Sequence, residues 1–189
     1  MAAAENTKKR GTGLTGAAGE YYVAAELSLR GWLATPTIKN APGTDVLAQY
    51  REAGILVAIQ TKTASFGNQF MMNAGIERPS MADNEWVVLV KLHEIKSRPS
   101  FFVVPLNHVA AAAYAQHRRW LGTPGQGGQE HRDNPRRTLI AKRFLDYEDR
   151  WDLLLQPTSA VPNLLGADYA ECIAAWGVPP GHPGMPSRE

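Results

Sequence analysis

The residues best suited to chemistry in this 189-residue chain lie between Gly43 and Ser65. Asp45 follows a turn-forming sequence, and Gln60, Thr61 and Lys62 end the next apolar run. The Asp45 carboxylate, the Gln60 amide oxygen and the Thr61 backbone carbonyl are hard oxygen ligands of the kind that Mg²⁺ prefers. A lysine beside such ligands can orient a water, help its deprotonation, or offset negative charge on a five-coordinate phosphorus. The stretch therefore predicts a metal site suited to phosphodiester hydrolysis.

A β-hairpin is predicted to position these residues, with strands at 45–50 and 55–63 and a turn at 51–54. Because side chains alternate along a strand, Gln60 and Lys62 should lie side by side on one face of the second strand. Both faces of that strand are apolar before the polar pair. This pattern is expected of a central strand that is covered on both sides.

Glu20 could supply a second acid from a helix predicted at 15–30, with Thr15 as its N-cap and Gly31 just past its end. Glu20 shares its helical stripe with three apolar residues, Val23, Ala24 and Leu27. The carboxylate should therefore face the rest of the protein. Glu26 and Arg30, four residues apart, should instead form an exposed pair on another face. A glutamate at the edge of an apolar stripe is also common without any function.

The other elements follow from apolar runs, turn residues and helical periodicity. Strands are expected at 32–38, 86–92 and 101–104, helices at 107–120, 144–155 and 167–176, and loops at 66–83 and 122–135. The first of these strands contains Pro36 and should lie at a sheet edge. Trp151 and Leu154 should dock on the core, and His117, on the apolar stripe of its helix, should be a packed or helix-end histidine.

Length and composition favour one domain with appendages. We expect an arm at 1–13, a domain at 14–156, and a helix with a Pro/Gly-rich tail at 157–189 whose last dozen residues are disordered. The single cysteine, Cys172, allows no intramolecular disulfide and no cysteine-rich zinc site. Neither a signal peptide nor a membrane-spanning run is present, so a cytoplasmic protein with no membrane partner is expected.

Charge is unevenly distributed, although the net charge is only +2. Residues 1–143 hold 18 Lys or Arg and 11 Asp or Glu, while residues 144–189 hold 2 and 7. The candidate phosphate contacts are Arg118, Arg119, Arg132, Arg136, Arg137, Lys142 and Arg143. A solvated basic face would look the same in the sequence.

The order of these motifs resembles that of the PD-(D/E)XK nuclease superfamily. The residues that carry the resemblance are Gly16-x-x-Gly19-Glu20, Gly43-Thr44-Asp45, and Ile59-Gln60-Thr61-Lys62-Thr63. The pattern is similar to that of small endonuclease-like proteins and of archaeal Holliday-junction resolvases, over about residues 14–65 and loosely to Val104. It departs from the family in having Thr44 before the Asp and Gln60 in place of the usual acid.

The resemblance implies a restriction-endonuclease-like fold, with a mixed central sheet flanked by helices and Mg²⁺ at a strand fork, where Mn²⁺ can substitute. It implies Glu20, Asp45, Gln60 and Lys62 as catalytic residues of a DNA endonuclease that acts on duplex or branched DNA. It also leaves a homodimer open.

Two alternatives stand beside this reading. Because Gln60 removes a negative charge, the chain could be an inactive nuclease fold that binds nucleic acid or protein. Its acidic C-terminal part also allows a component that works with a protein partner.

Overall fold

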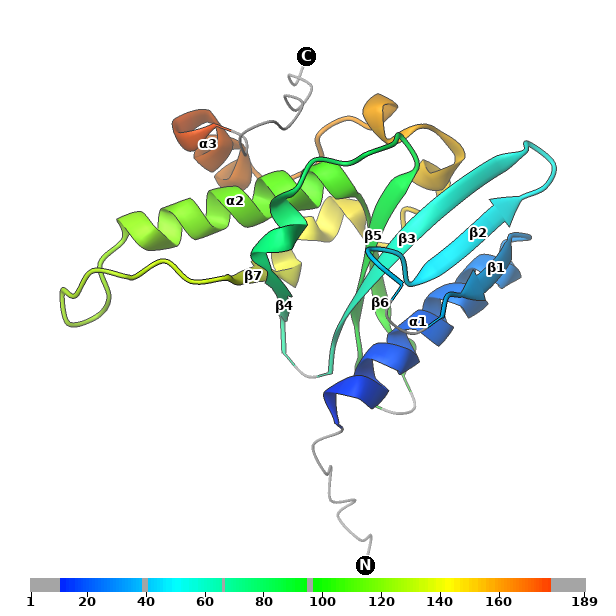
Figure 1. The fold of residues 1–189 in the computed structure, drawn as a ribbon, viewed down its shortest axis with the longest axis horizontal. Helices are drawn as coiled ribbons and strands as arrows, with labels where there is room; N and C mark the ends of the chain where they lie inside the picture. Colours follow the sequence, from blue (N-terminus) through cyan, green and yellow to red (C-terminus); the bar gives the residue numbers. More distant parts are fainter. Residues whose placement is uncertain (1–10, 39–40, 66, 95–96, 178–189) are drawn as a thin grey trace, which may run out of the picture.

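A computed structural model describes residues 11–38, 41–65, 67–94 and 97–177 of the chain. Helices pack on both faces of a central sheet, and a two-stranded ribbon stands beside it (Figure 1). The helices and strands are α1 (Thr12–Leu29), β1 (Leu33–Pro36), β2 (Val46–Tyr50), β3 (Ile55–Ala64), β4 (Gln69–Asn73), β5 (Glu85–Lys91), β6 (Ser100–Pro105), α2 (Leu106–Gly122), β7 (Arg136–Ile140) and α3 (Ala167–Trp176). Four short 3₁₀ segments complete the set: η1 (Ala74–Glu77), η2 (Ala141–Tyr147), η3 (Trp151–Leu155) and η4 (Thr158–Ala160).

The central sheet is mixed and has the strand order β1-β2-β3-β5-β6. β3 pairs antiparallel with β2 and parallel with β5, and β6 pairs antiparallel with β5. A parallel pair needs a crossover, which the chain makes here through β4 and η1. The predicted fold class, a mixed central sheet flanked by helices, is confirmed, and so is the edge position of β1.

Helix α1 covers one face of the sheet, with Val23 and Leu27 fully buried. Its C-terminus closes as a Schellman turn, in which Trp32 N–H donates to Leu27 O and Gly31 N–H donates to Ser28 O, both at 3.1 Å. Gly31 has a φ of +83°, which glycine adopts at no steric cost. The predicted end of the helix is therefore confirmed.

The predicted start of α1 is wrong. The helix begins at Thr12 with Gly11 as its N-cap, and Thr15 lies buried inside it. Residues 12 and 13, assigned to an arm by their small and glycine-rich sequence, belong to the exposed first turn of this helix. Residues 1–10 of the expected arm lie outside the described residues.

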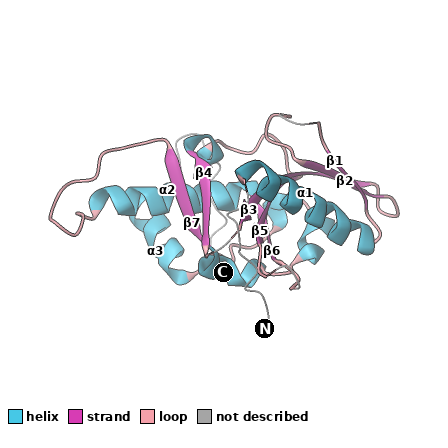
Figure 2. Ribbon diagram, turned by 90° about the horizontal axis from the view of Figure 1, so that it is seen from below, coloured by secondary structure: helices cyan, strands magenta, loops and turns pink. Residues whose placement is uncertain are grey.

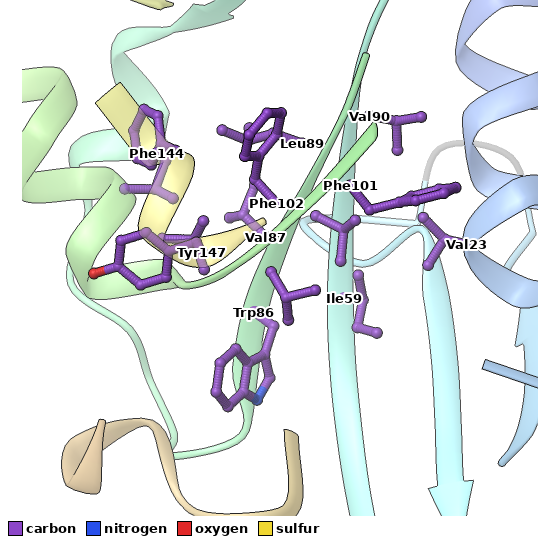
Figure 3. Close-up of a cluster of buried hydrophobic side chains, with 14 of the residues drawn as sticks. Val23, Ile59, Trp86, Val87, Leu89, Val90, Phe101, Phe102, Phe144 and Tyr147 are labelled. Carbon is purple, nitrogen blue, oxygen red and sulfur yellow. The ribbon is translucent and has the colours of Figure 1, made fainter. Parts of the chain in front are cut away.

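The opposite face of β5 and β6 is covered by α2 and by the segments that follow it. Alternate side chains of β5 point to opposite faces, so Leu89 lies near Phe144 and Tyr147 while Val90 lies on the side of α1 with Val23 (Figure 3). Helix α3 packs on α2, and the core includes Val161, Leu165 and Tyr169 from the region expected to be an appendage. The last dozen residues lie outside the description.

The β4–β7 ribbon was not expected from the sequence. The segment 66–83 was predicted to be a loop, but it contains β4 and η1, and the basic span contains β7. In β4 only Phe70 and Met72 are buried, so its apolar signal is short, and its partner strand lies more than sixty residues later. Such non-local pairing leaves little mark on local sequence.

Two further expectations need correction. The predicted helix at 144–155 is instead made of η2 and η3, although Trp151 and Leu154 are buried as expected. β3 is central but is covered on both faces only in its later part, because Leu56 is 60% exposed. The hairpin extends past the helices on that side (Figure 1). No helix in the described part of the chain is long and apolar enough to cross a membrane.

Candidate active site at the end of the hairpin

The Asp45 carboxylate lies where the β2–β3 ladder ends. Asp45 N–H donates to Ile59 O at 2.8 Å, and Asp45 Oδ2 accepts the Thr61 N–H at 2.6 Å. A side-chain oxygen thus takes the place beside β3 that a backbone carbonyl of a continued β2 would occupy. The hydrogen bond from Thr61 holds Oδ2 in place, and because the carboxylate is planar this also sets the position of Oδ1.

The Thr61 carbonyl points to the same side. The N–H and C=O groups of one residue face the same neighbouring strand, and the Thr61 N–H faces Asp45. Since β2 begins only at Val46, the carbonyl lies beyond the start of that strand. The Asp45 carboxylate and the Thr61 carbonyl therefore lie along the same edge of β3, while the Thr61 side chain is buried on the face opposite Gln60 and Lys62.

Gln60 and Lys62 share one face of β3 and line a cleft of about 640 Å³. Residues 42–44 form one wall and η1 with its flanking residues forms another. Within the described residues, Lys62 takes part in no direct ion pair. The ammonium group is therefore not neutralised by a structural carboxylate.

Glu20 does not line the cleft; it approaches Asp45 and Lys62 from the opposite face of β3, which α1 crosses at very short range. A Cβ on Gly19 would lie 1.9 Å from Thr63 Oγ1, so only glycine fits there without a shift. The pKa of Glu20 is raised by burial and by the negative charge of Asp45, and is lowered in part by Lys62. The structure thus brings Glu20, Asp45 and Lys62 into electrostatic contact, from elements that the sequence separates.

The donor set suits a hard divalent cation. Two carboxylates, one amide oxygen and one backbone carbonyl are all oxygen ligands, the chemistry that Mg²⁺ and Mn²⁺ accept. Among the described residues, no group of three His, Cys, Asp or Glu could hold a metal. A metal at this site would therefore depend on Gln60 and on the Thr61 carbonyl in addition to the two acids.

The seven basic residues of the predicted nucleic-acid contact do not share one environment. Arg137 is buried and pairs with Glu77, while Arg143 pairs with Asp168 at 2.6 Å and contacts Gln116. The other five are exposed: Arg118, Arg119, Arg132, Arg136 and Lys142. The two paired arginines hold elements together, and the exposed five are free to meet phosphates.

The cleft also contains residues that had no assigned role. Arg78 lines it, and Glu85 Oε2 accepts the Met81 N–H and the Ser80 hydroxyl, each at 2.6 Å. Ser80 N–H donates to Asn107 Oδ1 at 2.9 Å, which ties the segment to α2. No local signal in the sequence marked these residues, because their proximity to Lys62 comes from the crossover.

Taken together, the fold and the site define a mixed-sheet α/β domain with an acid, amide and lysine constellation at the end of a hairpin. No protein family model matches the chain, and no curated protein matches it. Two of the solved structures that match are nucleases. A bacterial homing endonuclease aligns with a TM-score of 0.47 and 16% identity, over 78% of this chain and 94% of its own.

The Holliday junction resolvase Hjc of Archaeoglobus fulgidus aligns with a TM-score of 0.39 and 13% identity, over 68% of this chain and 86% of its own. Both proteins belong to the class that the motif resembles. Because both TM-scores are below 0.5, the function proposed below rests on the geometry of the site.

Proposed function

We propose that this chain is a metal-dependent endonuclease that hydrolyses phosphodiester bonds in duplex or branched DNA, with Mg²⁺ as its ion and Mn²⁺ able to substitute. The observation that supports it best is the Asp45 carboxylate, which takes a backbone partner's place at Thr61 and so lies beside Gln60. If Asp45 served only to form the turn before β2, its carboxylate would not need to lie beside Thr61. The restriction-endonuclease-like architecture and a cytoplasmic location belong to the same proposal.

Each residue has a role that its position supports. Asp45, Gln60 and the Thr61 carbonyl would hold the ion, and Glu20 would add a second carboxylate from α1. The bound ion would polarise the phosphoryl oxygens and lower the pKa of a coordinated water. Lys62 would orient the attacking water and stabilise the negative charge that develops on the phosphate.

The raised pKa of Glu20 fits this assignment. Burial and Asp45 disfavour the ionised glutamate in the metal-free protein. A divalent cation between the two carboxylates would remove that repulsion and favour their ionised forms. Metal binding should therefore release protons near the raised pKa of Glu20, which calorimetry in buffers of different ionisation enthalpy can measure.

The direct test is cleavage of supercoiled plasmid, linear duplex, four-way junction, single-stranded DNA and RNA with Mg²⁺ or Mn²⁺. Asp45→Asn and Lys62→Met should each reduce cleavage by at least about 100-fold. Asp45→Asn keeps an oxygen that can accept the Thr61 N–H. A loss of cleavage in this variant would therefore result from the missing charge and not from a disturbed fold. Lys91→Met, a partly buried lysine at the end of β5 and outside the cleft, is the matched control. Cleavage that survives both site variants would overturn the proposal.

A second candidate is an inert nuclease-fold protein that binds nucleic acid or a protein partner. The observation that favours it is Gln60, because among the described residues no group of three His, Cys, Asp or Glu could hold a metal. The substitution Gln60→Glu separates the candidates. An active enzyme cuts before the substitution, whereas an inert protein binds DNA in a salt-sensitive way and cuts, if at all, only after it.

The five exposed cations would form the DNA contact. Replacing Arg118 and Arg119 together should weaken binding about equally for all DNA sequences and reduce the salt dependence of the affinity. Cutting both strands of a duplex at one place calls for two active sites, so a homodimer on DNA belongs to the proposal. Sedimentation with and without duplex DNA tests it.

A further inference from the structure

A second cavity lies at the far end of α2, away from the hairpin. It has a volume of about 450 Å³ and is lined by Gln116, His117, Trp120, Asn134, Pro135, Arg136 and Thr138. The long loop between α2 and β7 extends from this end of the molecule, on the side opposite β1 and β2 (Figures 1 and 2). Cavities of this size accept small organic molecules.

One wall of the cavity is aromatic and held in place. Trp120 stacks with His117 at a centroid distance of 5.4 Å and with His131 at 4.2 Å. His117 Nε2 also contacts Asp133 Oδ1 at 2.7 Å, which anchors the loop on the helix. A rigid aromatic wall suits a planar ligand, because little side-chain freedom remains to be lost on binding.

The polar side chains of the cavity present donors. Gln116 Oε1 accepts from the Arg143 guanidinium, and Asn134 Oδ1 accepts the Arg136 N–H at 2.9 Å. Both partners can only donate, which fixes the orientation of the two amides. Their NH₂ groups remain, and the Asn134 NH₂ makes only a 3.5 Å contact to Arg132 O. The Arg136 guanidinium adds further donors and joins no ion pair among the described residues.

We infer that this cavity binds the base of an unpaired nucleotide, with guanine preferred. Proteins bind unpaired bases by stacking on aromatic rings and by hydrogen bonds to the base edges. Guanine presents the acceptors O6 and N7 together, which matches paired donors such as arginine and amide NH₂ groups. Exposed Arg118 and Arg119 lie between His117 and Trp120 in α2, exposed Arg132 follows His131 in the loop, and all three suit the flanking phosphates.

The cavity and the active-site cleft share the β4–β7 ribbon. Asn73 of β4 lines the cleft, and its register partner in β7, Arg136, lines the cavity. Paired residues on antiparallel strands lie about 5 Å apart at Cα. A nucleic-acid strand that crosses this ribbon could place a phosphate in the cleft and an unpaired base in the cavity. The site would thus select substrates with unpaired nucleotides, such as branch points, bulges or single strands.

This inference rests on the proposed function only in taking nucleic acid as the ligand, and it is tested without cleavage. The probes are fluorescein-labelled 12-nucleotide strands of abasic spacers that carry one central guanine, one central adenine, or no base. Binding is measured by fluorescence anisotropy, with the full chain carrying Lys62→Met and with EDTA present. The strands have the same phosphates, so differences in affinity report the base.

The guanine strand should bind about tenfold more tightly than the abasic strand, and more tightly than the adenine strand. Trp120→Leu should remove the advantage of guanine, while Trp120→Phe should retain most of it. Gln116→Glu keeps an acceptor for Arg143 but removes the amide donor, and should also remove the preference for guanine. Arg118→Ala, outside the cavity, should weaken all three strands equally.

Equal binding of the three strands by the protein with an intact cavity would overturn the inference. It would also fall if Trp120→Leu, shown to be folded by circular dichroism, weakened the abasic and guanine strands alike. Should Trp120→Leu unfold the loop, Gln116→Glu gives the same decision. Because no metal or cleavage enters the assay, base binding can succeed while the nuclease proposal fails, or the reverse.

Discussion

Helix α1 carries two glutamates that meet opposite surroundings. Glu26 pairs with Arg30 at 2.6 Å and with Arg98 at 2.8 Å, and Arg98 in turn pairs with Asp149 at 2.7 Å. Glu20 faces Asp45 and Lys62 but takes part in no ion pair between described residues. The pKa of Glu26 is lowered mainly by the hydrogen bond from Arg98, whereas the pKa of Glu20 is raised by burial.

This difference separates a carboxylate paired within the fold from one that meets another carboxylate and joins no ion pair between described residues. Burying a carboxylate without a partner costs free energy. Such carboxylates are found mainly at functional sites. Glu26 and Arg30 near the end of α1, together with Arg98 and Asp149, form what we call the Arg98 group. This group joins α1 to the segment after η2, and its charges compensate one another within the chain. Glu20, Asp45 and Lys62 carry charges that an ion and a phosphate would complete.

The largest expected effect separates the two glutamates by activity. Glu20→Gln should lower metal-dependent DNA cleavage by about 100-fold, because it removes the carboxylate that would hold the metal together with Asp45. Glu26→Gln should leave the cleavage rate within about twofold, since Glu26 pairs with Arg30 and Arg98 and not with the residues of the proposed metal site. Initial rates with Mg²⁺ measure both. Equal cleavage rates for the two variants would contradict the proposal that Glu20, and not Glu26, serves the activity.

The position of Glu20 depends on the close approach of α1 to β3, and two glycines test it. Gly19→Ala should destabilise the protein by roughly 1–3 kcal/mol, because its Cβ would meet Thr63 Oγ1 at 1.9 Å. Gly16→Ala meets nothing within 4 Å and should be neutral or stabilising by up to about 1 kcal/mol through helix propensity. Urea denaturation gives both free energies of unfolding. A Gly19→Ala variant as stable as Gly16→Ala would contradict the tight crossing.

Substitutions in the Arg98 group should change the stability of the protein and leave its rate of DNA cleavage unchanged. Arg98→Ala should cost about 1 kcal/mol of unfolding free energy, a small value because the Arg98 side chain is 48% exposed and its pairs are screened. The cost should shrink in 1 M NaCl. Arg150→Ala removes an exposed pair with Asp152 and should cost close to nothing. A large loss of cleavage in Arg98→Ala would show that this group supports the site.

The smallest effect is a difference in pH dependence. A raised folded pKa means that the native state binds protons more tightly, so ionised Glu20 should lower stability as pH rises above about 4.5. Glu26 has the opposite sign, and its stabilisation should be lost as pH falls below that value. Relative to the unsubstituted protein, Glu20→Gln should therefore gain stability as pH rises through this range, while Glu26→Gln should lose it. Metal-free thermal unfolding from pH 3 to 7 measures the sign of both.

The sequence by itself determined the elements whose signals are local. The period-two alternation of 55–63 and the turn before Gly54 predict the hairpin, and the apolar stripe with Gly31 predicts the body and end of α1. The order of Glu20, Asp45, Gln60 and Lys62 also lies in the sequence. Helical spacing alone predicted the pair of Glu26 and Arg30.

Tertiary structure decided what depends on contacts between distant segments. The β4–β7 ribbon joins short strands far apart in the chain, and 3₁₀ segments replace the predicted helix where Trp151, Leu153 and Leu154 are all buried. Packing also brought Arg137 to Glu77 and Arg143 to Asp168, although in the sequence both arginines belong to one basic span. Local spacing can nominate a charged side chain, but whether it meets a partner is fixed by the elements that pack around it. That is why Glu20 and Glu26, two glutamates of one helix, differ in the partners that they meet in the folded protein.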